Sequence, residues 1–194
     1  MDTIFYTIFK PIVKFLVWFL YRPTIKGREN LPKDGAYVLA GNHTKWLDPV
    51  CLVAYNKKQI HFLAKEEMWH GISIIVVKAM GCIPVNRKIH DHDALESAYK
   101  CLDSGCSIGI FPEGTINRTK DITMPFKIGA VKMANKCDVP LVPFVITGKY
   151  KLFRKGATIE FLKPRKIGND IDKENKKLEK DIAKKIKESM NNGK

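Results

Sequence analysis

The chain has 194 residues, of which 45% are hydrophobic, which is typical of one globular domain with one appended segment. Its 34 lysine and arginine residues against 20 acidic residues give a formal net charge of +14, which favours acidic partners: nucleic acid, anionic lipid, phosphorylated substrates or an acidic carrier protein. The five cysteines are odd in number, scattered and never spaced as C-x-x-C, which argues against a disulfide framework and against zinc, and favours a reducing cytosolic environment.

The first predicted element is the most apolar stretch of the chain, IFYTIFKPIVKFLVWFLY at residues 4–21. As a helix, it gathers its polar side chains within an arc of about 60°, and these are Thr3, Thr7, Lys10 and Lys14. A membrane-spanning helix would place two lysines near the bilayer centre, at about 2.5–3.5 kcal/mol each. We therefore expect a helix embedded in one leaflet with its polar stripe facing the headgroups, the alternative being a core helix packed against the domain.

A polar segment rich in proline and glycine at residues 21–35 is predicted to be a linker. Beyond it, strand and helix patterns alternate, which predicts an α/β fold: a single domain with a largely parallel mixed sheet flanked by helices. Asp93 and Glu96 resemble a capping box for one of these helices. The predicted strands are 36–40, 60–64, 82–85, 107–111, 139–147 and 157–162, and the predicted helices are 49–56, 71–80 (or a buried segment there), 93–103 and 129–136.

The tail at residues 172–194 is charged but periodic. One helical face gathers its apolar side chains, which are Ile171, Leu178, Ile182, Ile186 and Met190. This favours a helix docked on the core, with a second membrane contact through its lysines as the weaker alternative. We therefore divide the chain into a membrane-anchoring helical segment at 1–22, a domain at 23–170 and a basic amphipathic helix at 171–194.

The first motif suited to catalysis is NHTKWLDP at residues 42–49, directly after the first predicted strand of the domain. In open α/β sheets ligands gather at the carboxyl ends of strands, so His43 is placed where catalytic residues tend to lie. Imidazole is a suitable general base near neutral pH, and the carboxylate of Asp48 could orient it and stabilise the imidazolium. Asp48 also precedes Pro49, so we expect it to cap the helix that begins there. On this stretch alone, a loop histidine beside a structural cap remains open.

Other motifs carry groups for binding a hydroxyl or an anion. In FPEGTINR, residues 111–118, Glu113 can orient a substrate hydroxyl or hold the loop by backbone hydrogen bonds. Two arginines, Arg87 and Arg118, each follow a predicted strand. Their planar guanidinium groups can bind one phosphate between them through paired hydrogen bonds. Lys127 can add charge. Each of these residues could equally be an ordinary turn or surface residue.

The order of the motifs NH-x4-D, G-x-I-P-V-N-R, FPEGT and VPLVPF resembles the lysophosphatidic acid acyltransferases of the glycerolipid acyltransferase family, over about residues 35–148. The resemblance implies that His43 is the catalytic base and that Asp48 supports it. It also implies that two further parts of the chain help to bind the phosphate of the acceptor, namely Arg87 and the EGT residues Glu113, Gly114 and Thr115.

The activity implied by this resemblance is transfer of a fatty acyl group from acyl-acyl carrier protein or acyl-CoA to the sn-2 hydroxyl of lysophosphatidic acid, giving phosphatidic acid. No metal and no cofactor beyond the thioester co-substrate is implied. The expected partners are the phospholipid bilayer, the lysophospholipid and the thioester donor, and the expected location is the cytoplasmic face of the cell membrane, monotopic or peripheral. Nucleic acid is not expected, because the aromatic residues concentrate in the N-terminal helix rather than among basic residues.

Two positions depart from the family pattern. Lys45 stands where the family usually has serine, and Ile116 stands where arginine often follows EGT, while Arg118 matches the second arginine of that form. The charge for the acceptor's phosphate would then come from Arg87, Arg118 and Lys127. Two alternatives stay open: an acyltransferase for another lipid acceptor, and a non-catalytic basic protein that binds membranes peripherally.

Overall fold

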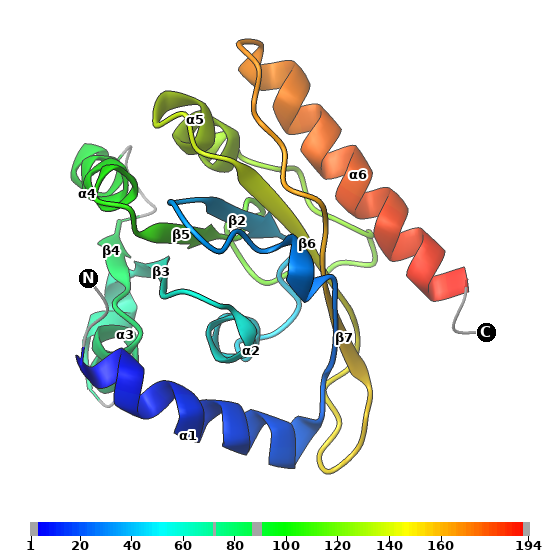
Figure 1. Ribbon diagram of the computed structural model, residues 1–194. Coiled ribbons are helices and arrows are strands. Elements are labelled where there is room, and N and C mark those ends of the chain that lie inside the picture. The colour runs from blue at the N-terminus through cyan, green and yellow to red at the C-terminus, as the bar shows by residue number, and fades with distance from the viewer. Residues whose placement is uncertain (1–3, 72, 87–90, 192–194) are drawn as a thin grey trace.

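A seven-stranded sheet forms the centre of the computed structural model, which describes residues 4–71, 73–86 and 91–191 (Figure 1). The strand order is β1-β7-β6-β2-β5-β3-β4. Neighbouring strands run parallel except for β6 and β7, which are antiparallel, so the predicted largely parallel mixed sheet is confirmed for the part of the chain described. The strands are β1 Thr24–Lys26, β2 Val38–Gly41, β3 Ile60–Lys65, β4 Ile83–Val85, β5 Ser107–Ile110, β6 Leu141–Gly148 and β7 Ala157–Phe161.

Helices cover both faces of this sheet (Figure 1). On one face α2 packs against the sheet and α1 packs on α2, while α4, α5 and α6 cover the other face. The predicted flanking helices are therefore confirmed. The helices are α1 Ile4–Tyr21, α2 Asp48–Tyr55, α3 Ser73–Ala79, α4 His92–Asp103, α5 Gly129–Lys136 and α6 Ile171–Asn191, with short 3-10 turns at Arg28–Asn30 and Glu66–Trp69.

Strand β2 divides its side chains between two hydrophobic cores, because successive residues of a strand point to opposite faces. Leu39 enters the core beneath α1 and α2, where it meets Phe144. Val38 and Ala40 enter the core beneath α4, α5 and α6. Since a central parallel strand is buried on both faces, its sequence is continuously apolar rather than alternating.

The predicted linker at 21–35 is wrong in one respect, because part of it is strand β1, which pairs with β7. Gly27 ends this strand with φ +66°, and a Cβ there would lie 2.0 Å from the carbonyl oxygen of Phe161. Only glycine fits so close to a neighbouring backbone. A three-residue edge strand is too short to show the alternation that identifies strands in a sequence.

The predicted capping box of α4 is also wrong. The helix begins at His92, and Asp91 is its N-cap, accepting from the amide of Ala94 at 2.9 Å. The same carboxylate accepts from the amide of Asn86 at 2.7 Å, and these backbone bonds lower the pKa of Asp91. Glu96 pairs instead with a lysine one turn further along the helix.

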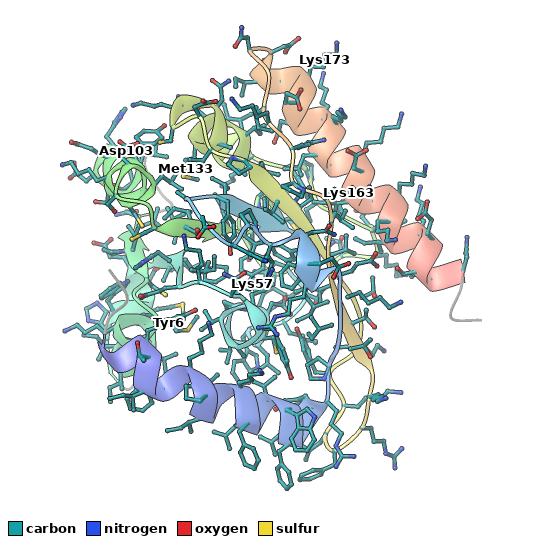
Figure 2. The ribbon with its side chains drawn as sticks, in the orientation of Figure 1. Tyr6, Lys57, Asp103, Met133, Lys163 and Lys173 are labelled. Carbon is teal, nitrogen blue, oxygen red and sulfur yellow. The ribbon has the colours of Figure 1, made fainter. Side chains whose placement is uncertain are left out.

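Helix α1 packs through one stripe of its surface. Tyr6 and Val17 are buried, and the hydroxyl of Tyr6 donates to the carbonyl of Lys58 at 2.9 Å. Lys10 lies on the same stripe and donates to the carbonyl of Lys57 at 3.3 Å. Figure 2 labels Tyr6 on α1 and Lys57, which follows α2. Lys10 is therefore directed at the protein and does not belong to the headgroup-facing stripe that the helical wheel predicted.

The remaining described surface of α1 is exposed and, apart from Thr7 and Lys14, largely apolar. Seven large apolar side chains there are 43–59% exposed: Ile8, Phe9, Ile12, Phe15, Leu16, Trp18 and Phe19. In the described part of the chain, no helix combines the length and the apolar character needed to cross a membrane. The helix therefore has one face that packs on the domain and one apolar face open to its surroundings.

The predicted docking of the C-terminal helix on the core is confirmed for most of its apolar face. Leu178, Ile182 and Ile186 of α6 are buried in the core beneath the sheet, whereas Met190 is 61% exposed. An ion pair between Arg165 and Asp181, at 3.0 Å, joins the preceding loop to the helix. The division of the chain into three segments stays a prediction.

Candidate active site

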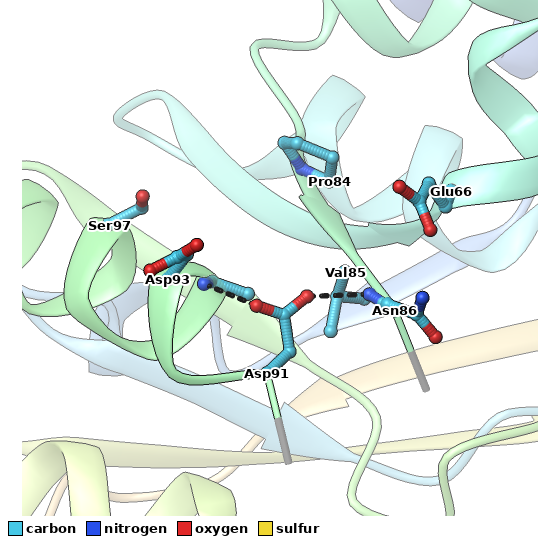
Figure 3. A pocket seen from close by; sticks show the side chains of 8 residues that line it. Glu66, Pro84, Val85, Asn86, Asp91, Asp93 and Ser97 are labelled. Carbon is cyan, nitrogen blue, oxygen red and sulfur yellow. Dashed lines mark hydrogen bonds between the residues drawn. The ribbon is translucent and has the colours of Figure 1, made fainter. Parts of the chain in front are cut away.

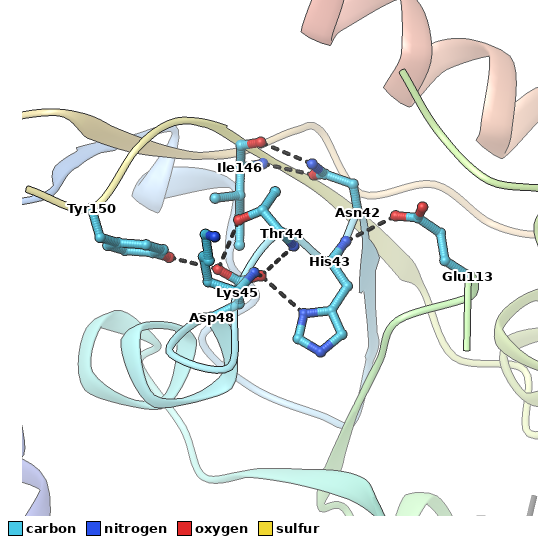
Figure 4. Close-up of polar contacts among 8 residues, drawn as sticks. All are labelled: Asn42, His43, Thr44, Lys45, Asp48, Glu113, Ile146 and Tyr150. Atoms are coloured by element: carbon cyan, nitrogen blue, oxygen red, sulfur yellow. Dashed lines mark hydrogen bonds and ion pairs between the residues drawn. The ribbon is translucent and has the colours of Figure 1, made fainter. Parts of the chain in front are cut away.

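The loop after β2 is fixed to both neighbouring strands of the sheet (Figure 4). The side-chain amide of Asn42 donates to the carbonyl of Ile146 on β6, and its oxygen accepts from the amide of Ile146, both at 2.8 Å. On the other side, the amide of His43 donates to Glu113, which follows β5, at 2.9 Å. These bonds hold His43 at the carboxyl edge of the sheet, between β5 and β6.

The structure brings His43 and Asp48 together across a turn, as expected. Nδ1 of His43 lies 2.9 Å from Oδ2 of Asp48, and the imidazole ring stacks on Phe111 with a centroid distance of 3.9 Å. The histidine side chain is 14% exposed and the aspartate side chain is fully buried. Because an ionised carboxylate only accepts, Nδ1 donates to it and the lone pair of the neutral ring lies on Nε2, which can take a proton.

Asp48 does not cap helix α2, so that part of the prediction is wrong. The helix begins at Asp48 itself, and its N-cap position makes no side-chain capping bond. The carboxylate turns back to the loop: Oδ2 accepts from the amides of Thr44 at 2.6 Å and Lys45 at 2.8 Å. Oδ1 accepts from the hydroxyls of Thr44 at 3.2 Å and Tyr150 at 2.8 Å. With the His43 bond, five hydrogen bonds hold this anion in place.

Tyr150 is a member of this network that the sequence did not reveal. It follows β6 and reaches Asp48 across 102 residues, so no local spacing links the two. Burial raises the pKa of Tyr150, and the charge of Asp48 raises it further, so the phenol stays protonated and donates. Nearby, burial raises the pKa of Cys51 to about 12, which keeps its thiol neutral and a poor nucleophile.

Glu113 holds loops in place through both of its carboxylate oxygens. It is 4% exposed, and it accepts from the amides of His43 and Met124, each at 2.9 Å. Burial raises the pKa of Glu113, while these backbone bonds oppose the rise. Of the two roles suggested by the sequence, backbone support is the one that its contacts display. The adjacent Gly114 has φ +73°, and a Cβ there would meet the Lys127 side chain at 3.2 Å.

The residues expected to bind phosphate are less tightly placed. Thr115, Arg118 and Lys127 are exposed. Arg87 lies outside the described residues.

A pocket beside Asn86, at the carboxyl end of β4, is shown in Figure 3. Its described lining contains three acidic residues and no cation: Glu66, Pro84, Val85, Asn86, Asp91, Asp93, Ala94 and Ser97.

A second pocket, of about 240 Å³, opens beside the catalytic candidates. His43 and Glu113 line it together with Lys120, a cation that no sequence motif singled out. Ile186 and Met190 bring an apolar wall from α6. The half-buried His43, the cation Lys120 and an apolar wall thus meet in one pocket, which the carboxylates of Glu113 and Asp121 also line.

Comparison with known proteins gives a consistent result. The family model described as acyltransferase matches residues 22–147. A 1-acyl-sn-glycerol-3-phosphate acyltransferase of Bacillus subtilis (strain 168) is 36% identical over 137 residues, which are 68% of this chain and 67% of the relative. The enzyme of the same name from Borreliella burgdorferi is 35% identical over 147 residues, 74% of this chain and 58% of the relative.

The fold is shared with a solved structure, the 1-acyl-sn-glycerophosphate acyltransferase of Thermotoga maritima, with a TM-score of 0.78. That structure is 22% identical in sequence, and the match covers 95% of this chain and 79% of that one. The chain spans 67% and 58% of the lengths of the two sequence relatives. Since the family model covers most of the chain, including the loop that carries His43 and Asp48, the chain belongs to the acyltransferase family.

Proposed function

We propose that this protein transfers a fatty acyl group from a thioester, acyl-CoA or acyl-acyl carrier protein, to the sn-2 hydroxyl of lysophosphatidic acid, giving phosphatidic acid. The observation that carries this proposal is the His43–Asp48 pair, with 2.9 Å between Nδ1 and Oδ2, in which Asp48 is buried and His43 lines a pocket. The family relation supports acyl transfer, and the names of the relatives support this acceptor.

In the proposed reaction Nε2 of His43 takes the proton of the acceptor hydroxyl as its oxygen attacks the thioester carbonyl. A carbon–oxygen bond forms, and the carbon–sulfur bond breaks as the tetrahedral intermediate collapses. The proton then passes from the imidazolium to the leaving thiolate, so that the free thiol departs. Asp48 stabilises the imidazolium between these steps and fixes the ring by its hydrogen bond to Nδ1.

The acceptor's phosphate needs cations near this pocket. We propose that Arg118, Lys120 and Lys127 supply them together with Arg87. Lys120 lines the pocket itself. The side chain of Lys127 packs against Gly114, the residue after Glu113. The apolar wall from α6 would face the hydrocarbon part of the same substrate.

A purified full-length chain in mixed micelles tests this function directly. We expect phosphatidic acid to form from lysophosphatidic acid and a thioester donor, detected by lipid mass spectrometry, with His43→Ala as the matched blank. Acyl-CoA and acyl-acyl carrier protein are supplied in separate reactions to identify the donor. Because Ile116 replaces a common arginine, other lysophospholipids belong in the same panel. If another lysophospholipid is acylated and lysophosphatidic acid is not, the proposed acceptor is wrong but the proposed acyl-transfer reaction stands. If no acceptor is acylated, the protein is better explained as a non-catalytic membrane-binding protein.

We further propose that the protein binds the cytoplasmic face of the cell membrane as a monotopic or peripheral protein. Seven large apolar side chains of α1 lie on the side away from α2, and Phe19 meets Phe153 of a neighbouring loop edge-on, with 5.6 Å between ring centroids. Burying one such half-exposed side chain contributes about 1 kcal/mol. The net charge of +14 adds attraction to anionic lipid.

Vesicle binding by point variants tests this placement better than deletion of the helix, because deletion would also remove the buried Tyr6 and Val17. Phe15→Gln with Trp18→Gln should weaken binding by at least about 10-fold, since two exposed rings leave the bilayer. Thr7→Gln, at an exposed polar position of the same helix, is the control and should change little. High salt should not release the unmodified protein, because apolar burial is not screened. Full release by salt would assign binding to the basic surface instead of α1.

A further inference from the structure

A cluster of possible metal ligands lies at the opposite edge of the sheet from the candidate active site. His61 is near the beginning of β3, Cys101 is in the last turn of α4, and Cys106 directly precedes β5. The register pairs Ile60 with Ser107, so the beginnings of β3 and β5 lie side by side. As a result, a ring nitrogen of His61 and both cysteine sulfurs lie within 4.8 Å of one another.

The hydrogen bonding of His61 fixes which nitrogen can bind a metal. Nδ1 lies 2.6 Å from the carbonyl oxygen of Gly81, which can only accept, so Nδ1 carries the proton. Nε2 then holds the lone pair, and it is buried with no hydrogen-bond partner among the residues that the structure describes. A metal-binding histidine commonly donates its other nitrogen to a backbone carbonyl in this way, which orients the ring.

The two cysteines are brought together by the turn between α4 and β5. The amide of Cys106 donates to the carbonyl of Cys101 at 3.0 Å. The hydroxyl of Ser104 donates to the same carbonyl at 2.8 Å and lies 3.6 Å from the sulfur of Cys106. Both cysteines are half-buried rather than fully enclosed in the core.

We propose that Nε2 of His61 and the sulfurs of Cys101 and Cys106 bind one Zn²⁺ ion, with water as the fourth ligand. One nitrogen and two sulfurs are a ligand set that zinc prefers in tetrahedral sites. The ligand atoms of such a site are about 3.6–3.8 Å apart, so the side chains need to draw together by at most about 1 Å. Binding converts both thiols to thiolates and releases their two protons to solvent.

Such an ion would link β3, α4 and β5 at the amino-terminal edge of the sheet, far along the strands from His43. Its role would therefore be to stabilise the fold rather than to take part in acyl transfer. The sequence argued against zinc because no pair of cysteines has C-x-x-C spacing. The third ligand, His61, is 40 residues before Cys101 and comes from a different strand, so spacing alone does not reveal the group.

The test uses the reduced, tag-free, full-length chain after treatment with a chelator. Titration of Zn²⁺ against a chromophoric chelator should give one ion per chain. Co²⁺ in its place should show a thiolate-to-cobalt charge-transfer band. Cys101→Ser, Cys106→Ser and His61→Gln should each weaken zinc affinity by more than about 100-fold, because loss of a ligand exceeds the 10–100-fold effect of losing an outer partner.

Cys137→Ser is the matched control, since Cys137 lies outside the cluster and the chemical change is the same. It should keep the wild-type affinity, and zinc should raise the midpoint of thermal unfolding of both this variant and the wild type. Equal zinc affinity in Cys101→Ser and Cys137→Ser would overturn the proposal. A wild type that binds no zinc, or a cobalt complex without the charge-transfer band, would overturn it as well.

Discussion

The candidate active site has two regions that are built in different ways. Around His43, the supporting carboxylates Asp48 and Glu113 are buried, and each of their four oxygens accepts at least one hydrogen bond. Around the expected phosphate, by contrast, Arg118 and Lys127 are exposed on loops. The hydrogen bonds of the fold position the first region, whereas under the proposed function the second would be positioned by the anionic substrate. Substitutions in the first should therefore change rate or stability, and substitutions in the second should change substrate affinity.

The largest effect is expected from removing the base. His43→Ala should lower kcat by about 10²–10⁴-fold, the usual contribution of a positioned general base. The fold should persist, because the backbone amide of residue 43, and not its ring, makes the bond to Glu113. Steady-state kinetics, with circular dichroism as the folding control, measure this. A folded variant with near-normal kcat would remove His43 from the mechanism.

Changing Asp48 to asparagine should have a smaller effect, for a reason visible in its contacts. The amide oxygen can take the place of Oδ2 and accept from His43 and the two backbone amides. The NH₂ group then faces the hydroxyls of Thr44 and Tyr150, which can accept as well as donate. The ring keeps its orientation and loses only the negative charge beside it, so kcat should fall by less than about 10²-fold. A loss larger than that of His43→Ala would show that Asp48 does more than support the base.

The same chemical change at Glu113 should affect stability instead. Both of its oxygens accept from backbone amides, of His43 and Met124, and a glutamine offers only one oxygen. Its NH₂ group would face a backbone N–H, leaving one buried donor without an acceptor. Glu113→Gln should lower the free energy of unfolding by about 1–3 kcal/mol. Denaturant unfolding of Glu113→Gln beside Asp48→Asn checks this, and equal stability of the two variants would contradict it.

Whether a contact of the candidate active site could be predicted depended on how far apart its two residues are in the sequence. His43 and Asp48 are five residues apart, so a single turn brings them together and their motif was informative. The contacts of Asp48 with Tyr150 and of Asn42 with Ile146 span 102 and 104 residues and depend on strand order, which no local pattern encodes. Apart from β1, the strands and helices of the domain followed from the pattern of apolar residues, because each buries at least one face.

The two errors about β1 and Lys10 also arose because the neighbours of these residues come from distant parts of the chain. Strand β1 was missed because it has three residues, and its partner β7 comes from the far end of the chain. The helical wheel of α1 grouped Lys10 correctly with the other polar residues. It could not show that the carbonyl of Lys57 lies beside the face of the helix that carries Lys10. An amphipathic pattern gives the faces of a helix and not the neighbour that each face meets.

The smallest effect is expected in the exposed region, and it decides whether that region binds the phosphate. Arg118→Lys keeps the charge but loses the planar fork that can hold two phosphate oxygens at once. Losing one hydrogen bond to a charged group, at about 1.5 kcal/mol, should raise KM for lysophosphatidic acid by about 10-fold. KM for the thioester and kcat should stay nearly constant, because the phosphate contact is equally strong in ground and transition states. Arg154→Lys, at an exposed position of the loop between β6 and β7, is the matched control. If Arg118→Lys and Arg154→Lys both keep the wild-type KM, Arg118 is a solvated surface residue. Recognition of the phosphate then falls to the other proposed cations, Lys120 in the pocket beside His43 together with Lys127 and Arg87.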